Sequence, residues 1–448
     1  MIVTTKYGKI EGVSERGCTV YKGVPYAKPP VGALRWRKPQ PPEVWEGVLH
    51  ADHFGNRSVQ FGNPNESFYK KEFYSNPAFD VPTSEDCLYL NIWTPEDQAE
   101  KLPVAIYVHG GAFMGGAGSN LPFVCDALVK TGLIVVTVNY RLGALGFLCH
   151  PLLGVPGENE AGGNFGLWDQ LAAIRWVKEN IEAFGGDPDN ISVFGQSAGA
   201  MSLQALAVAP QMHGLVQRMA LQSGGGYRNP LVSYRTIEEA QVFGEDMLEA
   251  LGQPREAWKE SEEAREAARK ALWETSEQEM SAALLKAMML SFGRRMGIPY
   301  SPVIDGELLS DDGHALIEQG RALPVPYLLG SNGDDLAAAR AHGAVVEDDG
   351  MHGANTAYAK RMEKPCYVYY FDRKMPGDEA GAFHSAELWY VFGSLDYCWR
   401  PLEAHDLALS KEMVAYWSNF FKAGDPNGEG LPLWRPCTDA DPFYALLK

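Results

Sequence analysis

The feature that most constrains the fold is a pair of almost continuous apolar runs of strand length. These runs are Leu102–Val108 and Leu133–Val138, and each of them ends in a Gly-rich or polar turn. Strands have this composition when both of their faces are buried, as in a parallel sheet. Residues 167–184 then carry apolar side chains at helical spacing, and the strand Ile191–Phe194 follows a turn at residues 185–188. This alternation predicts one mostly parallel α/β sheet.

Further segments extend the predicted sheet and place an insertion beside it. Val325–Leu329 and Tyr367–Phe371 have the pattern of two more buried strands, and the alternation over Thr4–Ile10 predicts an antiparallel N-terminal edge. Residues 236–296 are helical in character, so we expect a helical insertion over about residues 231–300. Because we find no internal repeat and no low-complexity linker, we expect a single domain over residues 1–448.

Composition and charge exclude several classes of protein. The chain of 448 residues is 46% hydrophobic, which suits a large core and excludes disordered and fibrous chains. Its net charge of -18 repels phosphate backbones, so nucleic acid is not an expected partner. No apolar run approaches the roughly 18 residues that cross a bilayer, so we expect no membrane span.

The cysteines and the N-terminus bear on the compartment. Seven cysteines lie at scattered positions without the spacing of metal ligands, so we expect no metal site. The N-terminus lacks the charged and then apolar layout of a secretory signal. We therefore expect reduced thiols in a cytoplasm. The sequence leaves the oligomeric state open between a monomer and a dimer.

A G-x-S-x-G pentapeptide marks the candidate nucleophile. It spans residues 195–199, follows the predicted strand Ile191–Phe194 and opens an apolar, Ala-rich helix over Ala198–Ala209. A serine on such a strained turn is exposed for attack, and the two glycines avoid collisions of Cβ atoms with the neighbouring strands and helix. We therefore expect Ser197 to be the nucleophile, with the N-terminus of the helix directed at a developing oxyanion.

Backbone amides for that oxyanion are expected from two places. Ala198 directly follows the nucleophile and supplies one N–H group. The loop at residues 109–113 follows the predicted strand Leu102–Val108 and resembles the oxyanion motif of hydrolases. Because its consecutive glycines allow a substrate carbonyl to approach the backbone, we expect Gly111 and Ala112 to be the other donors.

A serine hydroxyl also needs a base, and the base needs a carboxylate that orients it. His384 lies in the loop after the last predicted strand, where the base belongs in the chain order Ser, acid, His. Two adjacent carboxylates, Asp334 and Asp335, follow the strand Val325–Leu329 at the place expected for the acid. Their position in the sequence does not distinguish between them.

Four longer motifs carry a resemblance to a known family. They are Lys22–Gly32 (KGVPYAKPPVG), Glu85–Trp93 (EDCLYLNIW), Asn164–Gln170 (NFGLWDQ) and Phe184–Pro188 (FGGDP). Together they resemble the type-B carboxylesterase family, the cholinesterase-like branch of the α/β hydrolases, and within it the bacterial-type carboxylesterases. The resemblance implies an α/β-hydrolase fold with a mostly parallel central sheet, antiparallel N-terminal edge strands and helical cap insertions.

The resemblance also assigns the acid and the base. The family's acid lies in a G-x-N-x-D-E-G pattern, which aligns with residues 330–336 and puts Asp335 at the position of the usual glutamate. The side chain is therefore shorter by one methylene, and Leu336 stands where the family has glycine. The family's base motif resembles residues 384–388, followed by Tyr390–Gly393, which supports His384 as the base.

These assignments imply an enzyme, a carboxylic ester hydrolase that works through an acyl-enzyme intermediate. Ser197, Asp335 and His384 would act together on short to medium acyl or aryl esters, and the mechanism requires no metal or organic cofactor. Three alternatives remain open at this point. They are a specialised hydroxycinnamoyl or lactone esterase, an amidase on the same fold, and a non-catalytic binding protein of the cholinesterase-like kind.

Departures from the family pattern give further expectations about the pocket. The stretch between Asp335 and His384 is shorter than in the family, so a second cap segment, at about residues 336–364, is expected to be truncated. A wider and shallower mouth would follow. We expect its walls to be formed by Phe113, Trp389 or the aromatic segment Phe68–Phe79, with Phe113 and Trp389 as candidate substrate-binding residues.

Two more departures bear on compartment and substrate. Secreted members of the family pair the cysteine that matches Cys87 with an upstream cysteine, but the corresponding segment here is Ser58–Gln60. The missing partner agrees with a reducing cytoplasm. Gln196 stands where cholinesterases carry glutamate, which removes a charge beside the nucleophile. A choline-specific enzyme is therefore not expected.

Overall fold

The computed structural model describes residues 1–62, 67–154, 162–293, 299–336 and 350–448. Within them, twelve strands form one sheet in the order β1-β2-β3-β7-β9-β8-β10-β11-β12-β13-β14, with β4 paired to β2. All neighbouring strands from β9 through β8, β10, β11, β12 and β13 to β14 pair in parallel. Strands β1, β2, β3 and β7 are antiparallel to their neighbours along this path. The predicted mostly parallel sheet with an antiparallel N-terminal edge is confirmed.

The bounds of the elements are as follows. The strands of the large sheet are β1 (Ile2–Thr5), β2 (Gly8–Glu15), β3 (Cys18–Pro25), β4 (Val48–Ala51), β7 (Tyr89–Pro95), β8 (Leu102–Val108), β9 (Ile134–Val138), β10 (Gly186–Gln196), β11 (Arg218–Gln222), β12 (Tyr327–Asn332), β13 (Cys366–Phe371) and β14 (Ala445–Leu447). A small second sheet pairs β5 (Arg57–Ser58) with β6 (Thr83–Ser84). The helices are α1 (Phe68–Phe73), α2 (Asp126–Val129), α3 (Gly143–Phe147), α4 (Phe165–Asn180), α5 (Ala198–Ala207), α6 (Ile237–Ala250), α7 (Glu262–Trp273), α8 (Glu277–Gly293), α9 (Gly313–Glu318), α10 (Gly350–Ala359), α11 (Glu387–Val391) and α12 (Ala404–Ala423).

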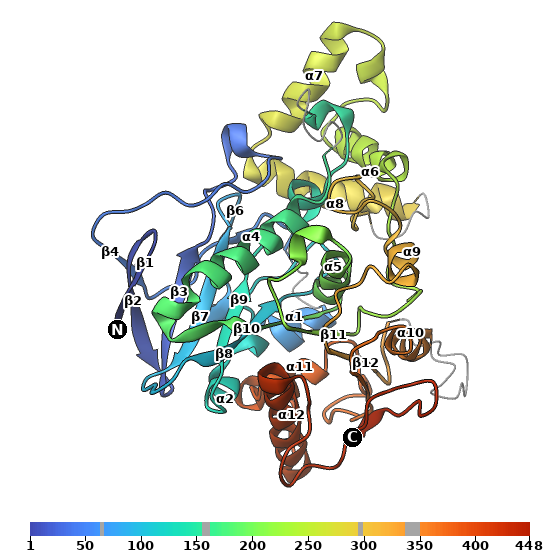
Figure 1. Cartoon of the computed structure of the whole chain (residues 1–448). Helices are drawn as coiled ribbons and strands as arrows, with labels where there is room; N and C mark the ends of the chain where they lie inside the picture. Colours follow the sequence, from blue (N-terminus) through green and yellow to red (C-terminus); the bar gives the residue numbers. More distant parts are fainter. Residues whose placement is uncertain (63–66, 155–161, 294–298, 337–349) are drawn as a thin grey trace.

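Both faces of the central strands are buried, as their apolar composition predicts. Along β8, Val104, Ile106 and Val108 join one hydrophobic cluster, and Ala105 and Tyr107 join the other. This division follows from the two-residue period of side chains along a strand. Helices α4 and α5 cover the first face, and α2, α11 and α12 cover the second (Figure 1).

The parallel strands bring separated segments to one edge of the sheet. The Gly-rich loop follows β8, Ser197 follows β10, Asp335 comes soon after β12, and His384 lies in the segment after β13. Parallel strands have their carboxyl ends at the same edge, where α/β proteins bind their ligands. The topology therefore gathers the candidate site residues from four crossovers.

Three of the described helices lie within residues 231–300, the segment that we expect to be a helical insertion. Helices α6, α7 and α8 fall within the predicted segment at residues 231–300 and extend beyond the sheet at the top of Figure 1. Of the second predicted segment at residues 336–364, residues 337–349 lie outside the described residues, and α10 forms most of the rest. None of the described helices has both the length and the apolar character needed to cross a membrane.

Some predicted boundaries are wrong for local reasons. The predicted turn at residues 185–188 is reduced to Gly185, which has a φ of 83°, because β10 already begins at Gly186 and pairs there with Leu102. Within residues 236–296, which the sequence predicts to be helical, the helix α7 begins only at Glu262. Glu256 has a left-handed backbone conformation, which interrupts helical structure before α7. The side chain of Ser261 caps the first turn of α7.

Candidate active site

The serine of the pentapeptide lies on a strained turn between β10 and α5. Ser197 has a φ of 55° and a ψ of −127°, backbone angles that residues other than glycine rarely adopt. Its backbone N–H donates to the carbonyl of Gln222 at 2.8 Å, which ties the turn to the neighbouring strand. A Cβ at Gly199 would lie 2.1 Å from the Val108 oxygen, and one at Gly195 would lie 2.8 Å from the carbonyl carbon of Gly199. Only glycine therefore allows this close approach of strand, turn and helix.

The loop after β8 lies against the serine turn. A Cβ at Gly110 would lie 2.9 Å from the Cβ of Ser197, and one at Gly111 would lie 2.0 Å from the Gly115 oxygen. Gly111 and Ala112 both have positive φ, at 117° and 53°. Glycine is therefore required at position 110, where the loop meets the serine, and at position 111, where the loop folds back on itself.

One side chain fixes the far end of this loop. Gln60 accepts a hydrogen bond from the Gly116 N–H at 2.9 Å and donates to the Gly116 carbonyl at 3.0 Å. In the sequence, Gln60 is distinguished only as part of the segment that lacks a cysteine, so its contact with this loop was not predicted. The signal was weak, because a single glutamine far from the motif has no distinctive pattern.

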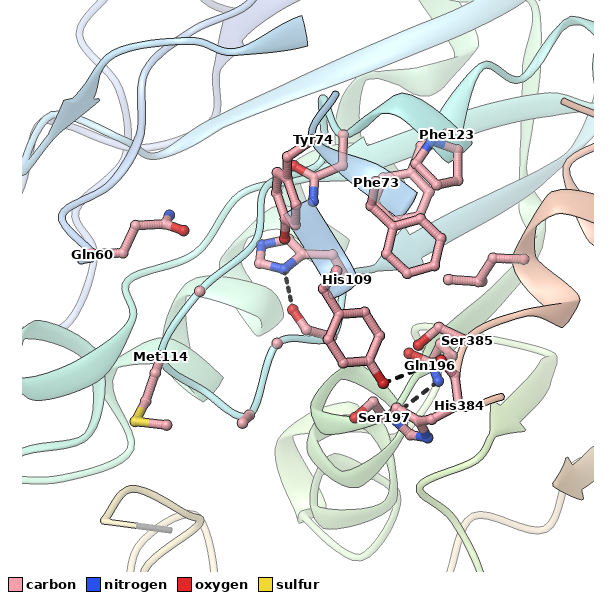
Figure 2. Close-up of a pocket in the computed structure, with 18 of the residues that line it drawn as sticks. Gln60, Phe73, Tyr74, His109, Met114, Phe123, Gln196, Ser197, His384 and Ser385 are labelled. Atoms are coloured by element: carbon pink, nitrogen blue, oxygen red, sulfur yellow. Dashed lines mark hydrogen bonds between the residues drawn. The ribbon is translucent and has the colours of Figure 1, made fainter. Parts of the chain in front are cut away.

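His384 connects a buried carboxylate to the serine turn. Its Nδ1 is hydrogen bonded to Asp335, and its Nε2 lies 3.3 Å from the side-chain nitrogen of Gln196, next to Ser197. An ionised carboxylate only accepts, so the Nδ1 atom carries the proton and Nε2 keeps its lone pair. Figure 2 shows Gln196, Ser197 and His384 gathered on one side of the cavity, with Gln60 and Met114 on the other.

The two adjacent aspartates have different surroundings. Asp335 is 2% exposed, and its carboxylate also accepts from the backbone N–H groups of Asn332 and Leu336, each at 3.0 Å. Asp334 instead accepts from Lys374 and from the Ala382 N–H, each at 2.8 Å. The structure thus brings Asp335, and not Asp334, to the imidazole.

The charges of His384, Asp335 and Glu387, which are all buried, affect one another. Burial by itself would lower the pKa of His384, but the neighbouring Asp335 carboxylate outweighs it and the pKa is raised above 6.5. Burial would raise the pKa of Asp335, but the charge and hydrogen bond of His384 lower it. A third group, Glu387, is fully buried, and burial followed by the charge of Asp335 raises its pKa to about 7.

Ser197 and His384 face a cavity of about 300 Å³. Ser197, His384 and the loop residues Gly111 and Ala112 all contribute to its surface. Among the described residues, no Asp, Glu, Lys or Arg contributes. The remaining wall is mostly aromatic and apolar, with Phe61, Tyr69, Phe73, Tyr74, Tyr107, Met114, Phe123, Leu336 and Leu388.

The predicted aromatic segment Phe68–Phe79 provides part of this wall, through Tyr69, Phe73 and Tyr74 on and beside α1. Phe113 and Trp389 are not among the described residues that line the cavity. Phe113 is 2% exposed and packs edge-on against Phe147, and Trp389 is fully buried beside Phe73. Both side chains are buried in the protein interior and do not form part of the described cavity surface.

The chain matches the carboxylesterase family over residues 1–348 and 349–448. The chain belongs to the carboxylesterase family. This carboxylesterase is a carboxylic ester hydrolase with the α/β-hydrolase fold.

Individual relatives agree with this assignment. The para-nitrobenzyl esterase of Bacillus subtilis (strain 168) is 34% identical, over 96% of this carboxylesterase and 91% of the relative. The fumonisin B1 esterase of Sphingopyxis macrogoltabida is 32% identical, over 94% of this chain and 82% of that one. Among solved structures, a thermophilic para-nitrobenzyl esterase superposes with a TM-score of 0.85 at 31% identity, covering 100% of this chain and 96% of that chain.

Proposed function

We propose that this carboxylesterase hydrolyses uncharged esters with short to medium acyl or aryl groups through a covalent acyl-enzyme on Ser197. The observation that carries the proposal is the position of His384, hydrogen bonded to the buried Asp335 on one side and adjacent to the Ser197 turn on the other. In this proposal Ser197, Asp335 and His384 form a catalytic triad.

Each member of the triad has a separate task. The Ser197 hydroxyl oxygen attacks the ester carbonyl carbon while the lone pair on His384 Nε2 takes the hydroxyl proton. The imidazolium then gives that proton to the leaving alcohol, and Asp335 stabilises the positive ring and holds its orientation. Water repeats the sequence on the acyl-enzyme, with His384 again as base, and releases the acid.

Backbone amides would stabilise the negative charge that develops on the carbonyl oxygen. Within the described residues, the N–H groups of Gly111, Ala112 and Ala198 have no hydrogen-bond acceptor. Ala198 is the first residue of α5, where the positive end of the helix dipole adds to the attraction. Free donors held in place before the reaction stabilise the transition state without reorganising, which is the basis of an oxyanion hole.

The cavity wall supports the proposed class of substrate. A lining that is rich in aromatic and apolar side chains, and that contains no carboxylate, Lys or Arg among the described residues, favours apolar acyl or aryl groups, because burying an unpaired charge there costs free energy. The relative from Bacillus subtilis is a para-nitrobenzyl esterase, whose name indicates an aromatic ester. We also place the enzyme in the cytoplasm, because a reducing compartment suits its seven free cysteines, six of them buried.

The proposal is tested by trapping the intermediate. Rapid mixing with a p-nitrophenyl ester should release a burst of p-nitrophenol equal to the enzyme concentration. Mass spectrometry of the quenched protein should show one acyl group on the peptide that contains Ser197. Ser197→Ala should give neither signal. Turnover by the wild type without an adduct on Ser197, or turnover by Ser197→Ala equal to that of the wild type, would contradict the proposal.

A further inference from the structure

Helix α1 forms part of the cavity wall and is short. It spans Phe68–Phe73, only six residues, and the side chain of Ser67 caps its N-terminus. Isolated helices shorter than roughly 12 residues are marginal in water, so contacts with the rest of the protein must hold it in place. Tyr69 and Phe73 on this helix line the cavity, and the Tyr69 hydroxyl donates to the His384 carbonyl at 3.5 Å.

A buried carboxylate anchors this helix. Glu72 is 1% exposed, and its oxygens accept from the Arg400 guanidinium at 2.7 and 3.2 Å and from the Trp399 indole N–H at 2.8 Å. Lys71, the preceding residue, has its ammonium 3.1 Å from the centre of the Trp399 ring. Two consecutive residues of α1 therefore contact Trp399, and Glu72 is also bound by Arg400.

Arg400 also holds the segment that leads to His384. Its side chain is fully buried, and its second terminal nitrogen donates to the Pro376 carbonyl at 2.9 Å and to Asp378 at 2.7 Å. The nitrogen that faces Glu72 also reaches Asp378, at 3.0 Å. Phe383, next to His384, lies between the two segments, 5.1 Å from the guanidinium carbon and in edge contact with Phe68.

The arrangement uses the particular shape of arginine. A planar guanidinium presents its N–H groups in a fixed fork and can bind two carboxylates at once, whereas a lysine ammonium is a single point charge. Stability alone gives little reason for such a group, because a buried ion pair is often no more stabilising than apolar residues of the same volume. What the fork adds is a defined distance between the two segments that it joins.

We propose that Arg400, through Glu72 and Asp378, is a positioning residue that fixes the aromatic wall on α1 relative to the loop that carries His384. This inference rests on the proposed function and adds to it a determinant of acyl-group selectivity. The bonds between Arg400 and Glu72 determine the position of α1, whose aromatic side chains would contact a long acyl group. The Asp378 side of the fork sets the approach of the imidazole to the serine, which every ester requires.

The chain offers a matched control in a second buried pair. Arg35 and Glu85 have 8% and 7% of their side chains exposed, and Arg35 also donates to backbone carbonyls, including those of Leu272 and Thr275. Neither residue lines the cavity. Glu85→Gln therefore measures what the loss of a buried ion pair does to the fold alone.

The experiment measures kcat and KM for p-nitrophenyl acetate and p-nitrophenyl octanoate, with the thermal midpoint of each variant. We expect Glu72→Gln to raise KM for the octanoate about tenfold while kcat for the acetate changes less than about twofold. Asp378→Asn, at a side chain that is 34% exposed, should lower kcat for both esters by a similar factor. Arg400→Lys should combine both effects.

The control defines the result that would overturn the proposal. If the three variants shift the thermal midpoint as Glu85→Gln does, but keep the wild-type ratio of octanoate to acetate turnover and the wild-type kcat, Arg400 is a structural residue only. If the wild type hydrolyses neither ester, the proposed function itself fails. The two failures are therefore distinguished by the activity of the wild type.

Discussion

At the scale of single residues, two carboxyl groups act on one imidazole. Asp335 is bonded directly to His384, and its charge raises the pKa of the ring despite burial. Glu387 adds to this effect from its own buried position, where it accepts a hydrogen bond from Asn332 at 2.5 Å. Because the pKa of Glu387 is raised to about 7, first by burial and then by Asp335, the charge of this carboxyl group changes near neutral pH.

This coupling predicts the pH dependence of the reaction. The base must be neutral to accept the serine proton, so kcat/KM should rise with pH, with a midpoint above 6.5. Glu387→Gln removes a charge that favours the imidazolium, so the midpoint should move down, on the order of half a pH unit. A pH profile of kcat/KM for both proteins checks this. A midpoint that stays in place or moves up in the variant would contradict the coupling.

The residues with a fixed chain context could be predicted, and those defined by neighbours in space could not. Ser197 lies between a recognisable strand and helix, and His384 follows a recognisable strand, so local pattern located both. The choice of Asp335 over Asp334 came from the family pattern alone, and the contacts of the two side chains support it in the structure. Glu387 appeared in the sequence only as part of a motif, because the carboxylate that shifts its pKa lies 52 positions away.

At the scale of elements, the Gly-rich loop after β8 depends on a side chain from elsewhere. Gln60 accepts from the Gly116 N–H and donates to the Gly116 carbonyl, and so holds the loop that carries the proposed oxyanion donors. Gln204 forms the same pair of hydrogen bonds with the backbone N–H and carbonyl of Gly226, at 2.7 and 3.1 Å. The second pair lies away from the cavity and makes a natural comparison.

The first pair should therefore matter for the rate and the second only for stability. We expect Gln60→Ala to lower kcat about tenfold, less than the loss of a complete oxyanion donor, because the loop is displaced and not removed. Gln204→Ala should keep kcat within about twofold and lower the thermal midpoint. The measurement is steady-state kinetics with one short ester. Equal effects of the two variants on kcat would show that Gln60 has no special role.

The central strands that the sequence revealed are those with long, continuous apolar runs. β8 begins and ends where predicted, whereas β11 was missed because only its middle residues are apolar, between Arg218 and Gln222. β14 was missed for a related reason, since three residues give no pattern and the strand exists only through its pairing with β13. Both strands therefore form through pairing with strands that are distant in the sequence.

At the scale of the whole molecule, the cavity lining differs from the strongly acidic protein around it. The net charge is -18, yet among the described residues no carboxylate lines the cavity. The wall is built from segments as distant as Phe61, Tyr107 and Leu388. The sequence predicted the contribution of the segment Phe68–Phe79, but not the other aromatic side chains, because these depend on which rings the tertiary structure turns inward.

The uncharged wall predicts discrimination against cations. Butyrylcholine and 3,3-dimethylbutyl butyrate have the same shape in the alcohol portion but differ in one positive charge. We expect the neutral ester to have the higher kcat/KM, by about tenfold, because desolvation of the ammonium is offset only in part by the aromatic rings. The comparison belongs at physiological salt, where the Debye length of about 8 Å screens the attraction of the acidic surface for cations. A preference for the choline ester would contradict the prediction.

The central claim is that Ser197, His384 and Asp335 act as one unit. Its most direct test is the pre-steady-state hydrolysis of p-nitrophenyl butyrate by the wild type, Asp335→Ala and Asp334→Ala, with Ser197→Ala as the blank. The account predicts a burst in the wild type, a loss of about 10³-fold or more in Asp335→Ala, and a change of less than about fivefold in Asp334→Ala. An Asp335→Ala variant that reacts as fast as the wild type, or an Asp334→Ala variant that loses as much, would contradict it.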